Sequence, residues 1–375
     1  MMGRAGFTVA GYLVFAGSVT LDAKPTDGKQ TTVRVSVRRT STEVEASRAA
    51  GSAAFDTKRG RMIIFSAVGT DESRGGGVLT TYDPVAERFN TIQTTGPSPT
   101  GVGHPSLVYD PKRDALLIFG GWADGRDGPT DEFWLLELGE AGRRSWRLLP
   151  RVEKGPCRRN GAVMVLDRER DGILLHGGDG GAHPKYGFTP LDDLWSYDLT
   201  SGEWKRLEPS GAVPPPRWNH CGAIDPRSGR LYLFGGVGYL PDERLVRDND
   251  VFVLDLEKLV WTRRSCSGDC PKAAQGATLT FDTDARVLVL IGGLHLAVGG
   301  KSGTTSVWTY DVDAASWTEQ READRKYRRS HMAVYDPIRQ QHVVHGGQTA
   351  WVPGNYYERG QPLHDTFFIT VTRSK

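Results

Sequence analysis

Arginines recur along this 375-residue chain, each just before a short run of small residues. The residues concerned are Arg48, Arg158, Arg217 and Arg329. A planar guanidinium holds a carboxylate or phosphate through two parallel hydrogen bonds, so a ring of such groups would bind an anion or an acidic peptide. The same side chains could instead only bond the carbonyls of neighbouring loops, and both interpretations stay open.

Three histidines, His104, His220 and His331, occupy nearly equivalent places in the chain. Three imidazoles around a channel could bind a metal, but single polar residues that satisfy loop backbone explain them more simply. We therefore expect no metal site. His176 and His345 stand where related segments carry an apolar residue, most often phenylalanine, and we expect both to be buried packing residues.

Several long, mutually unlike segments carry aromatic and charged side chains of the kind that anchor protein interfaces. We expect a protein partner to contact the following residues: Trp122, His183, Tyr186, Phe188, Tyr239, Arg244, Trp351, Tyr356, Tyr357 and Arg359. The alternative is that these segments fold over their own strands and bury their rings.

No catalytic constellation is recognisable in the sequence. It contains no Gly-x-Ser-x-Gly elbow, no His-Glu-x-x-His pair and no phosphate-binding loop. We therefore assign no catalytic residue and expect no cofactor.

The elements that position these residues follow from an internal repeat. Five times an Asp is followed ten residues later by a Gly-Gly doublet that ends an apolar run, first as Asp110 with Gly120-Gly121. The second glycines of the doublets lie 57, 58, 57 and 54 residues apart. A repeat near 50 residues with few helix signals predicts a radial array of small sheets.

Each repeat reads as four strands, here called A to D. Residues 222–225 form a small-residue strand A, and residues 231–234 form an apolar strand B that ends at the glycines. Strand C alternates in polarity, as in residues 252–255, and strand D carries one large aromatic, Trp261 in this repeat. Aromatics in fixed register indicate packing between neighbouring sheets rather than a ligand platform.

The pattern resembles the Kelch repeat, with the Gly-Gly after an apolar run, the following Tyr-Asp or Leu-Asp strand and the later Trp. The resemblance covers about residues 45–375, although Ser66-Ala67 replaces the first doublet. It implies an all-β, six-bladed propeller like the central propeller of galactose oxidase. The expected blades are listed by number: 49–95, 103–150, 158–208, 217–264, 273–320 and 328–375.

The two ends of the chain predict how the ring closes. The last repeat stops after its third strand, and residues 31–38 have the character of the missing fourth, so the N-terminus should complete the last blade. Residues 1–29 then form a hairpin or extension, for which a weak signal peptide is the alternative. A decayed strand at residues 12–17 leaves a partial seventh blade as a second possibility.

Composition limits the class of partner. The net charge of +2, from 47 basic and 45 acidic residues, indicates no nucleic-acid partner, and no segment predicts membrane insertion. Cys266 and Cys270 could form a small disulfide loop or remain thiols, and a zinc site lacks two further ligands. An intracellular protein is favoured over a secreted one.

These patterns favour a non-catalytic protein-interaction module, a subunit or adaptor of a larger assembly. Antiparallel A-B-C-D order places the B–C and D–A connections on one face, and that face should bind the partner. The alternative is an enzyme that processes a carbohydrate or small acid at the channel mouth, as some Kelch propellers do. A propeller fold by itself does not distinguish the two.

Overall fold

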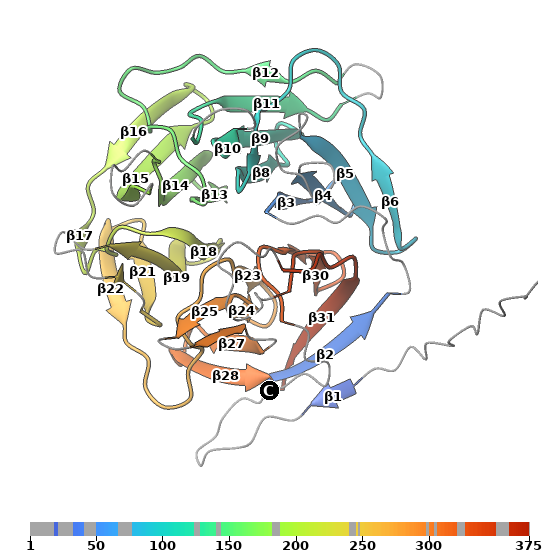
Figure 1. Cartoon of the computed structure of the whole chain (residues 1–375), viewed down its shortest axis with the longest axis vertical. Helices are drawn as coiled ribbons and strands as arrows, with labels where there is room; N and C mark the ends of the chain where they lie inside the picture. Colours follow the sequence, from blue (N-terminus) through green and yellow to red (C-terminus); the bar gives the residue numbers. More distant parts are fainter. Residues whose placement is uncertain are drawn as a thin grey trace, which may run out of the picture.

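Six antiparallel sheets lie in a ring about one axis (Figure 1). The computed structural model describes residues 19–21, 33–40, 50–66, 77–123, 128–139, 144–181, 188–239, 245–246, 248–297, 300–303, 306–320, 327–349 and 360–374. Within these ranges every regular element is a strand. The predicted fold class, an all-β six-bladed propeller, is confirmed.

Each blade carries its strands A to D from the inside of the ring to the outside. Blade 1 consists of β3 (Ser52–Asp56), β4 (Arg61–Ser66), β5 (Val78–Asp83) and β6 (Arg88–Thr91). Blade 2 consists of β8 (Ser106–Asp110), β9 (Ala115–Phe119), β11 (Phe133–Glu137) and β12 (Arg147–Leu148). Blade 3 consists of β13 (Val163–Asp167), β14 (Gly172–Asp179), β15 (Pro190–Asp198) and β16 (Glu203–Leu207). Blades 4 and 5 consist of β18 (Trp218–Asp225), β19 (Arg230–Tyr239), β21 (Val251–Asp255) and β22 (Val260–Arg264); and β23 (Thr278–Asp282), β24 (Val287–Ile291), β27 (Val307–Asp311) and β28 (Ser316–Gln320).

Short additional strands extend some blades. β17 (Ser210–Gly211) runs parallel to β22 at the outer edge of blade 4, and β20 (Leu245–Val246) pairs with β19. In the connections, β7 (Gly101–Gly103) pairs with β10 (Trp122–Ala123), and β25 (Leu294–Ala297) pairs with β26 (Gly300–Gly303).

Blade 6 is built from both ends of the chain, as the sequence predicts. It contains β29 (Met332–Asp336), β30 (Gln341–His345) and β31 (Thr366–Arg373), and β2 (Val33–Arg39) pairs antiparallel with β31. In Figure 1 the blue β2 lies beside the red β31. β1 (Val19–Leu21) then pairs antiparallel with β2. The decayed strand at residues 12–17 lies outside the described residues.

The large aromatic of strand D packs across the seam onto the preceding blade, as predicted. In five seams it contacts the strand B residue that directly precedes the glycine doublet or its counterpart. Ring centroids are 4.8–6.0 Å apart in these pairs: Phe65–Trp146, Phe119–Trp204, His176–Trp261, Phe234–Trp317 and His345–Phe89. His176 and His345 are buried, so their predicted packing role is confirmed.

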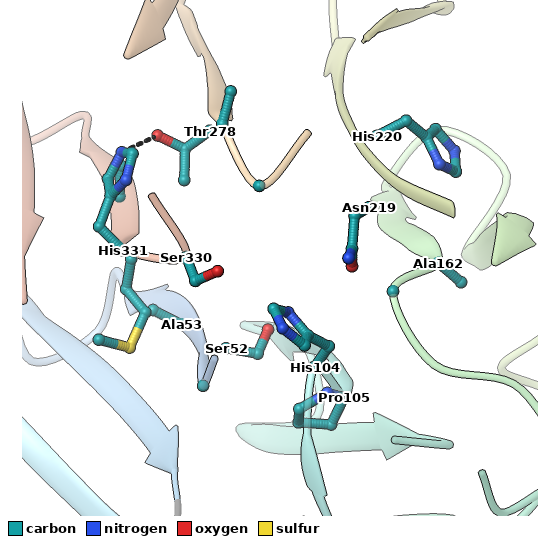
Figure 2. A pocket seen from close by; sticks show the side chains of 16 residues that line it. Ser52, Ala53, His104, Pro105, Ala162, Asn219, His220, Thr278, Ser330 and His331 are labelled. Atoms are coloured by element: carbon teal, nitrogen blue, oxygen red, sulfur yellow. Dashed lines mark hydrogen bonds between the residues drawn. The ribbon is translucent and has the colours of Figure 1, made fainter. Parts of the chain in front are cut away.

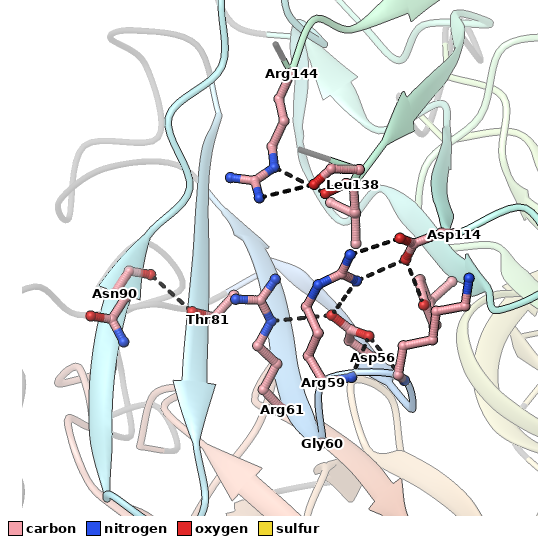
Figure 3. A network of polar contacts seen from close by, with 12 residues as sticks. Asp56, Arg59, Gly60, Arg61, Thr81, Asn90, Asp114, Leu138 and Arg144 are labelled. Atoms are coloured by element: carbon pink, nitrogen blue, oxygen red, sulfur yellow. Dashed lines mark hydrogen bonds and ion pairs between the residues drawn. The ribbon is translucent and has the colours of Figure 1, made fainter. Parts of the chain in front are cut away.

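Polar contacts join A–B turns of neighbouring blades on the opposite face from the long loops, and Figure 3 shows those between blades 1 and 2. Asp56 accepts the backbone N–H groups of residues 58 and 59, and the Arg59 side chain bridges Asp56 to Asp114 of blade 2 at 2.7 Å. Arg113 makes the equivalent bridge to Asp171 of blade 3. Contact with Arg59 holds the pKa of Asp114 at about 2, below its usual range. The charged side chains of these turns therefore bind one blade to the next.

Two further observations concern the cysteine pair and the length of apolar helices. Cys266 and Cys270 are joined by a disulfide in the connection that follows blade 4. Within the described part of the chain, no helix has the length and apolar character needed to cross a bilayer.

Candidate binding surface at the channel mouth

The B–C and D–A connections share one face of the ring, which is where the sequence predicts the partner-binding residues. Trp122, Phe188 and Tyr239 lie within the described residues. The remaining ones lie outside them, namely His183, Tyr186, Arg244, Trp351, Tyr356, Tyr357 and Arg359. The basic residue Arg48 also lies outside them.

Two of these residues gather around a ring that the sequence analysis did not single out. Trp218 begins strand A of blade 4 and is buried, and the Phe188 ring stacks on it with centroids 5.2 Å apart and planes 14° apart. Tyr239 contacts the same indole at 6.1 Å. Because Trp218 fixes the ring next to it, Phe188 remains 41% exposed yet held in place.

The exposed indole of Trp122 lies on the neighbouring blade. Trp122 is also 41% exposed, and its backbone is bridged to Pro129 across the same loop. A Cβ added to Gly181 of blade 3 would lie 2.7 Å from the Pro129 ring, so the loops of blades 2 and 3 touch. Trp122, Phe188, Trp218 and Tyr239 are hereafter the aromatic patch, which extends over blades 2 to 4.

The predicted ring of arginines at the channel mouth is wrong for Arg217. Its side chain is 1% exposed, donates to the carbonyl of Gly235 at 2.9 Å and pairs with Asp248 at 3.0 Å. A guanidinium packed against loop carbonyls and a carboxylate cannot also hold a ligand in the channel. The interpretation that these arginines bond neighbouring loops is the correct one here.

The same kind of buried arginine–aspartate pair recurs in two other blades. There it is formed by the arginine adjacent in sequence to the one predicted to line the channel. Arg159 pairs with Asp193 at 2.7 Å, and Arg328 pairs with Asp365 at 2.7 Å. Burial opposes ionisation of Asp193, but the bonds from Arg159 outweigh it and leave the pKa of Asp193 lowered. These ion pairs attach each D–A connection to the end of the B–C loop in its own blade.

Arg158 and Arg329 therefore occupy different places in the repeat from Arg217. Arg158 precedes the buried arginine of its blade and is exposed. Arg329 follows the buried arginine, is half-buried and donates to the Gln348 side chain at 3.4 Å. Their part in binding stays a prediction, but they do not form a ring with Arg217.

Six residues at the inner ends of the D–A connections form a closed circle of backbone hydrogen bonds. Each donates its N–H to the carbonyl of its counterpart in the adjacent blade, at 2.7–3.0 Å. All six have a left-handed φ of 50° to 65°. These channel-ring residues are Ala50, His104, Gly161, Asn219, Gly276 and Ser330.

Side chains alternate around this ring. Blades 2, 4 and 6 contribute His104, Asn219 and Ser330, whereas blades 1, 3 and 5 contribute only alanine or glycine. The backbone N–H and carbonyl groups of the ring bond one another. The three polar side chains are therefore the groups that the ring presents to the channel, and Figure 2 shows them approaching one space.

That space is a cavity of about 190 Å³ lined by all six blades. Besides the channel-ring residues of blades 2 to 6, Ser52, Thr278, His220 and His331 contribute to its wall. Among the described residues, none of its lining side chains is Asp, Glu, Lys or Arg. The titratable side chains of this lining are those of His104, His220 and His331.

The three histidines considered as metal ligands are not equivalent. His104 belongs to the channel ring, whereas His220 and His331 each follow a ring residue by one position. The His220 ring turns to His176, with Nε2 3.1 Å from Nδ1, and His331 bonds Thr278 at 2.8 Å. Burial lowers the pKa of His220 and lowers that of His331 to about 3.

Comparison with known proteins identifies relatives that match this chain over only a part of their own length. The chain is 28% identical over 285 residues to the host cell factor homolog hcf-1 of Caenorhabditis elegans, covering 70% of this chain and 33% of that protein. It is 37% identical over 121 residues to dynein regulatory complex subunit 7 of Chlamydomonas reinhardtii, covering 32% of this chain and 10% of that one. The chain thus spans a third or less of these curated relatives.

Solved structures share the fold. YjhT matches with a TM-score of 0.63 at 15% identity, covering 89% of this chain and 99% of that one. A fungal alcohol oxidase in complex with copper matches with a TM-score of 0.54 at 12% identity, covering 89% and 75%. The family model for the KLHDC2/KLHL20/DRC7 Kelch-repeats domain matches residues 13–236 and 112–347, so the chain belongs to that Kelch-repeat family.

Proposed function

We propose that the protein is a non-catalytic interaction module, a subunit or adaptor of a larger assembly, that binds a protein partner through the B–C and D–A face. The observation that carries the proposal is the aromatic patch. Single exposed apolar residues are ordinary on a protein surface. Here two large rings on one face are each 41% exposed, and one is held by a buried indole.

Rigid aromatic anchors suit protein recognition. Tyr and Trp provide large contact areas and dominate the binding energy of many interfaces, while most surrounding contacts contribute little. Because Phe188 is already stacked on Trp218, ordering it on binding costs little side-chain entropy. The exposed Arg158 lies in the D–A connection of blade 3 and adds a charged donor at the rim.

The relatives support the same class of function. A host cell factor homolog and a dynein regulatory complex subunit carry a matching Kelch segment, and the second is a complex subunit by name. Both proteins are much longer than this chain, so their particular partners are not assigned to it. The proposal takes from them only a role in a protein assembly.

The test begins with affinity purification of the protein under mild conditions and mass spectrometry of what elutes with it. A stoichiometric partner is then titrated against the unmodified protein and against the double variant Trp122→Ser with Phe188→Ser. We expect the dissociation constant to rise at least about tenfold, since hot-spot truncations cost about 2 kcal/mol or more.

The matched control changes two exposed apolar residues on the opposite face, Val85→Ser with Ile338→Ser. These residues are 70% and 55% exposed and lie in a C–D and an A–B turn. The control should bind as the unmodified protein does. If both double variants bind equally well, or if only the control loses affinity, the assigned face is wrong.

A further inference from the structure

The channel ring presents three polar side chains that share one hydrogen-bonding property. An imidazole, a primary amide and a hydroxyl can each donate and accept a hydrogen bond. They come from every second blade, so they are spaced roughly evenly about the channel axis (Figure 2). Groups that both donate and accept match hydroxyl groups, which do the same.

The cavity behind these groups selects against charge. Its described lining has no Asp, Glu, Lys or Arg. Arg159, Arg217 and Arg328 pair with Asp193, Asp248 and Asp365, and Arg329 donates to Gln348. A charged ligand would lose its hydration here without meeting an opposite charge, which is costly. An uncharged polar ligand would only exchange water for hydrogen bonds.

The volume of the cavity sets the size of the ligand. At about 190 Å³ it is somewhat larger than a cavity of about 150 Å³ that admits one benzene ring. The cavity is therefore large enough for one six-membered ring.

We propose that the channel cavity is a binding site for a small uncharged polyol with a six-membered ring, contacted by His104, Asn219 and Ser330. This site is separate from the aromatic patch and does not depend on a protein partner. Its affinity rests on hydroxyl hydrogen bonds to the three side chains. Its selectivity rests on the absence of a counter-charge.

The experiment measures binding of myo-inositol and glucose to the full chain by calorimetry and saturation-transfer NMR. Gluconate, the carboxylate counterpart of glucose, tests the exclusion of charge. We expect at least one of the two neutral probes to bind. If glucose binds, gluconate should bind at least about tenfold more weakly than glucose. Failure of both neutral probes to bind at millimolar concentration would overturn the proposal.

Variants of the channel ring identify the contacts. The triple variant His104→Gly, Asn219→Gly and Ser330→Gly removes the polar groups, and glycine tolerates the left-handed φ of these positions. We expect it to keep its melting temperature within a few degrees and to lose binding more than about tenfold. The control Ala50→Gly lies in the same ring and should bind normally. Equal binding by the triple variant and the control would refute the assigned contacts.

Discussion

The buried pair His176 and His220 makes the seam between blades 3 and 4 sensitive to acid. Burial, together with the positive charge of Arg217, lowers the pKa of His176 to about 3. In the unfolded chain a histidine titrates near pH 6.5. Below that pH the unfolded state takes up a proton that the folded state does not, so the free energy of unfolding falls as the pH falls.

The size of the effect follows from the two pKa values. Each pH unit between about 6.5 and about 3 costs about 1.4 kcal/mol for a histidine that stays neutral in the fold. From about pH 7 to about pH 4.5 this amounts to about 3 kcal/mol for His176 alone. The variant His176→Phe removes this contribution and can keep a ring against Trp261, as Phe234 does against Trp317.

We therefore expect two stability curves that converge or cross. At neutral pH His176→Phe should be less stable by about 1–3 kcal/mol, because it leaves the Nε2 of His220 without its partner. Towards about pH 4.5 the variant should gain about 3 kcal/mol relative to the unmodified protein. The reverse change, Phe234→His, should add a similar loss in acid at the equivalent position of blade 4.

Urea unfolding followed by tryptophan fluorescence, at neutral pH and near pH 4.5, measures these differences. The m-values should agree among the three proteins, so that shifts of the midpoint report stability. Parallel pH dependence in the unmodified protein and His176→Phe would refute the reasoning, because it would mean that His176 is not held neutral in the folded state.

Three further changes test the fold that positions the site. Deletion of residues 1–40 removes β2 with two buried valines and should lower the free energy of unfolding by about 3 kcal/mol or more, and an unchanged melting temperature would contradict closure by the N-terminus. Gly161→Ala should lower the free energy of unfolding more than Gly268→Ala does. Both glycines have a positive φ, so the backbone strain is similar. The new Cβ at residue 161 would lie 2.4 Å from an amide oxygen, whereas the one at residue 268 meets nothing within 4 Å. Trp204→Ala should cost about 3 kcal/mol by opening the seam to blade 2, whereas Trp122→Ala on the surface should stay within about 0.5 kcal/mol. Thermal unfolding of each pair decides these comparisons.

The repeat made the architecture predictable because its signals are local. The Asp of Asp110 and its equivalents closes a tight turn, and the glycine doublet marks where strand B meets the next blade with a positive φ. Both signals recur at nearly fixed spacing, so blade number, strand order and the missing strand of blade 6 could be read from the sequence. The aromatic seams were predictable for the same reason.

The site was less predictable because its determinants are not local. The burial of Arg217 depends on Asp248, which lies 31 residues further along the chain in a loop of unrelated sequence. The channel ring is defined by φ and by hydrogen bonds between blades, and its residue types have no common motif. Glycine at two of its positions and asparagine at a third are a weak signal for left-handed backbone, but alanine and serine at two others are none.

Arginine variants now separate folding from binding on this face. Arg217→Ala would leave Asp248 as a largely buried carboxylate without its partner and would free the carbonyl of Gly235. Breaking such a pair costs about 3–5 kcal/mol, so we expect a large fall in melting temperature. Arg158→Ala removes an exposed side chain that has no ion pair among the described residues, and its stability should change by less than about 0.5 kcal/mol. Binding lost by the first variant therefore reports a damaged fold, whereas binding lost by the second reports a contact. Equal melting temperatures for the two variants would show that the buried ion pair does not hold the D–A connection in place.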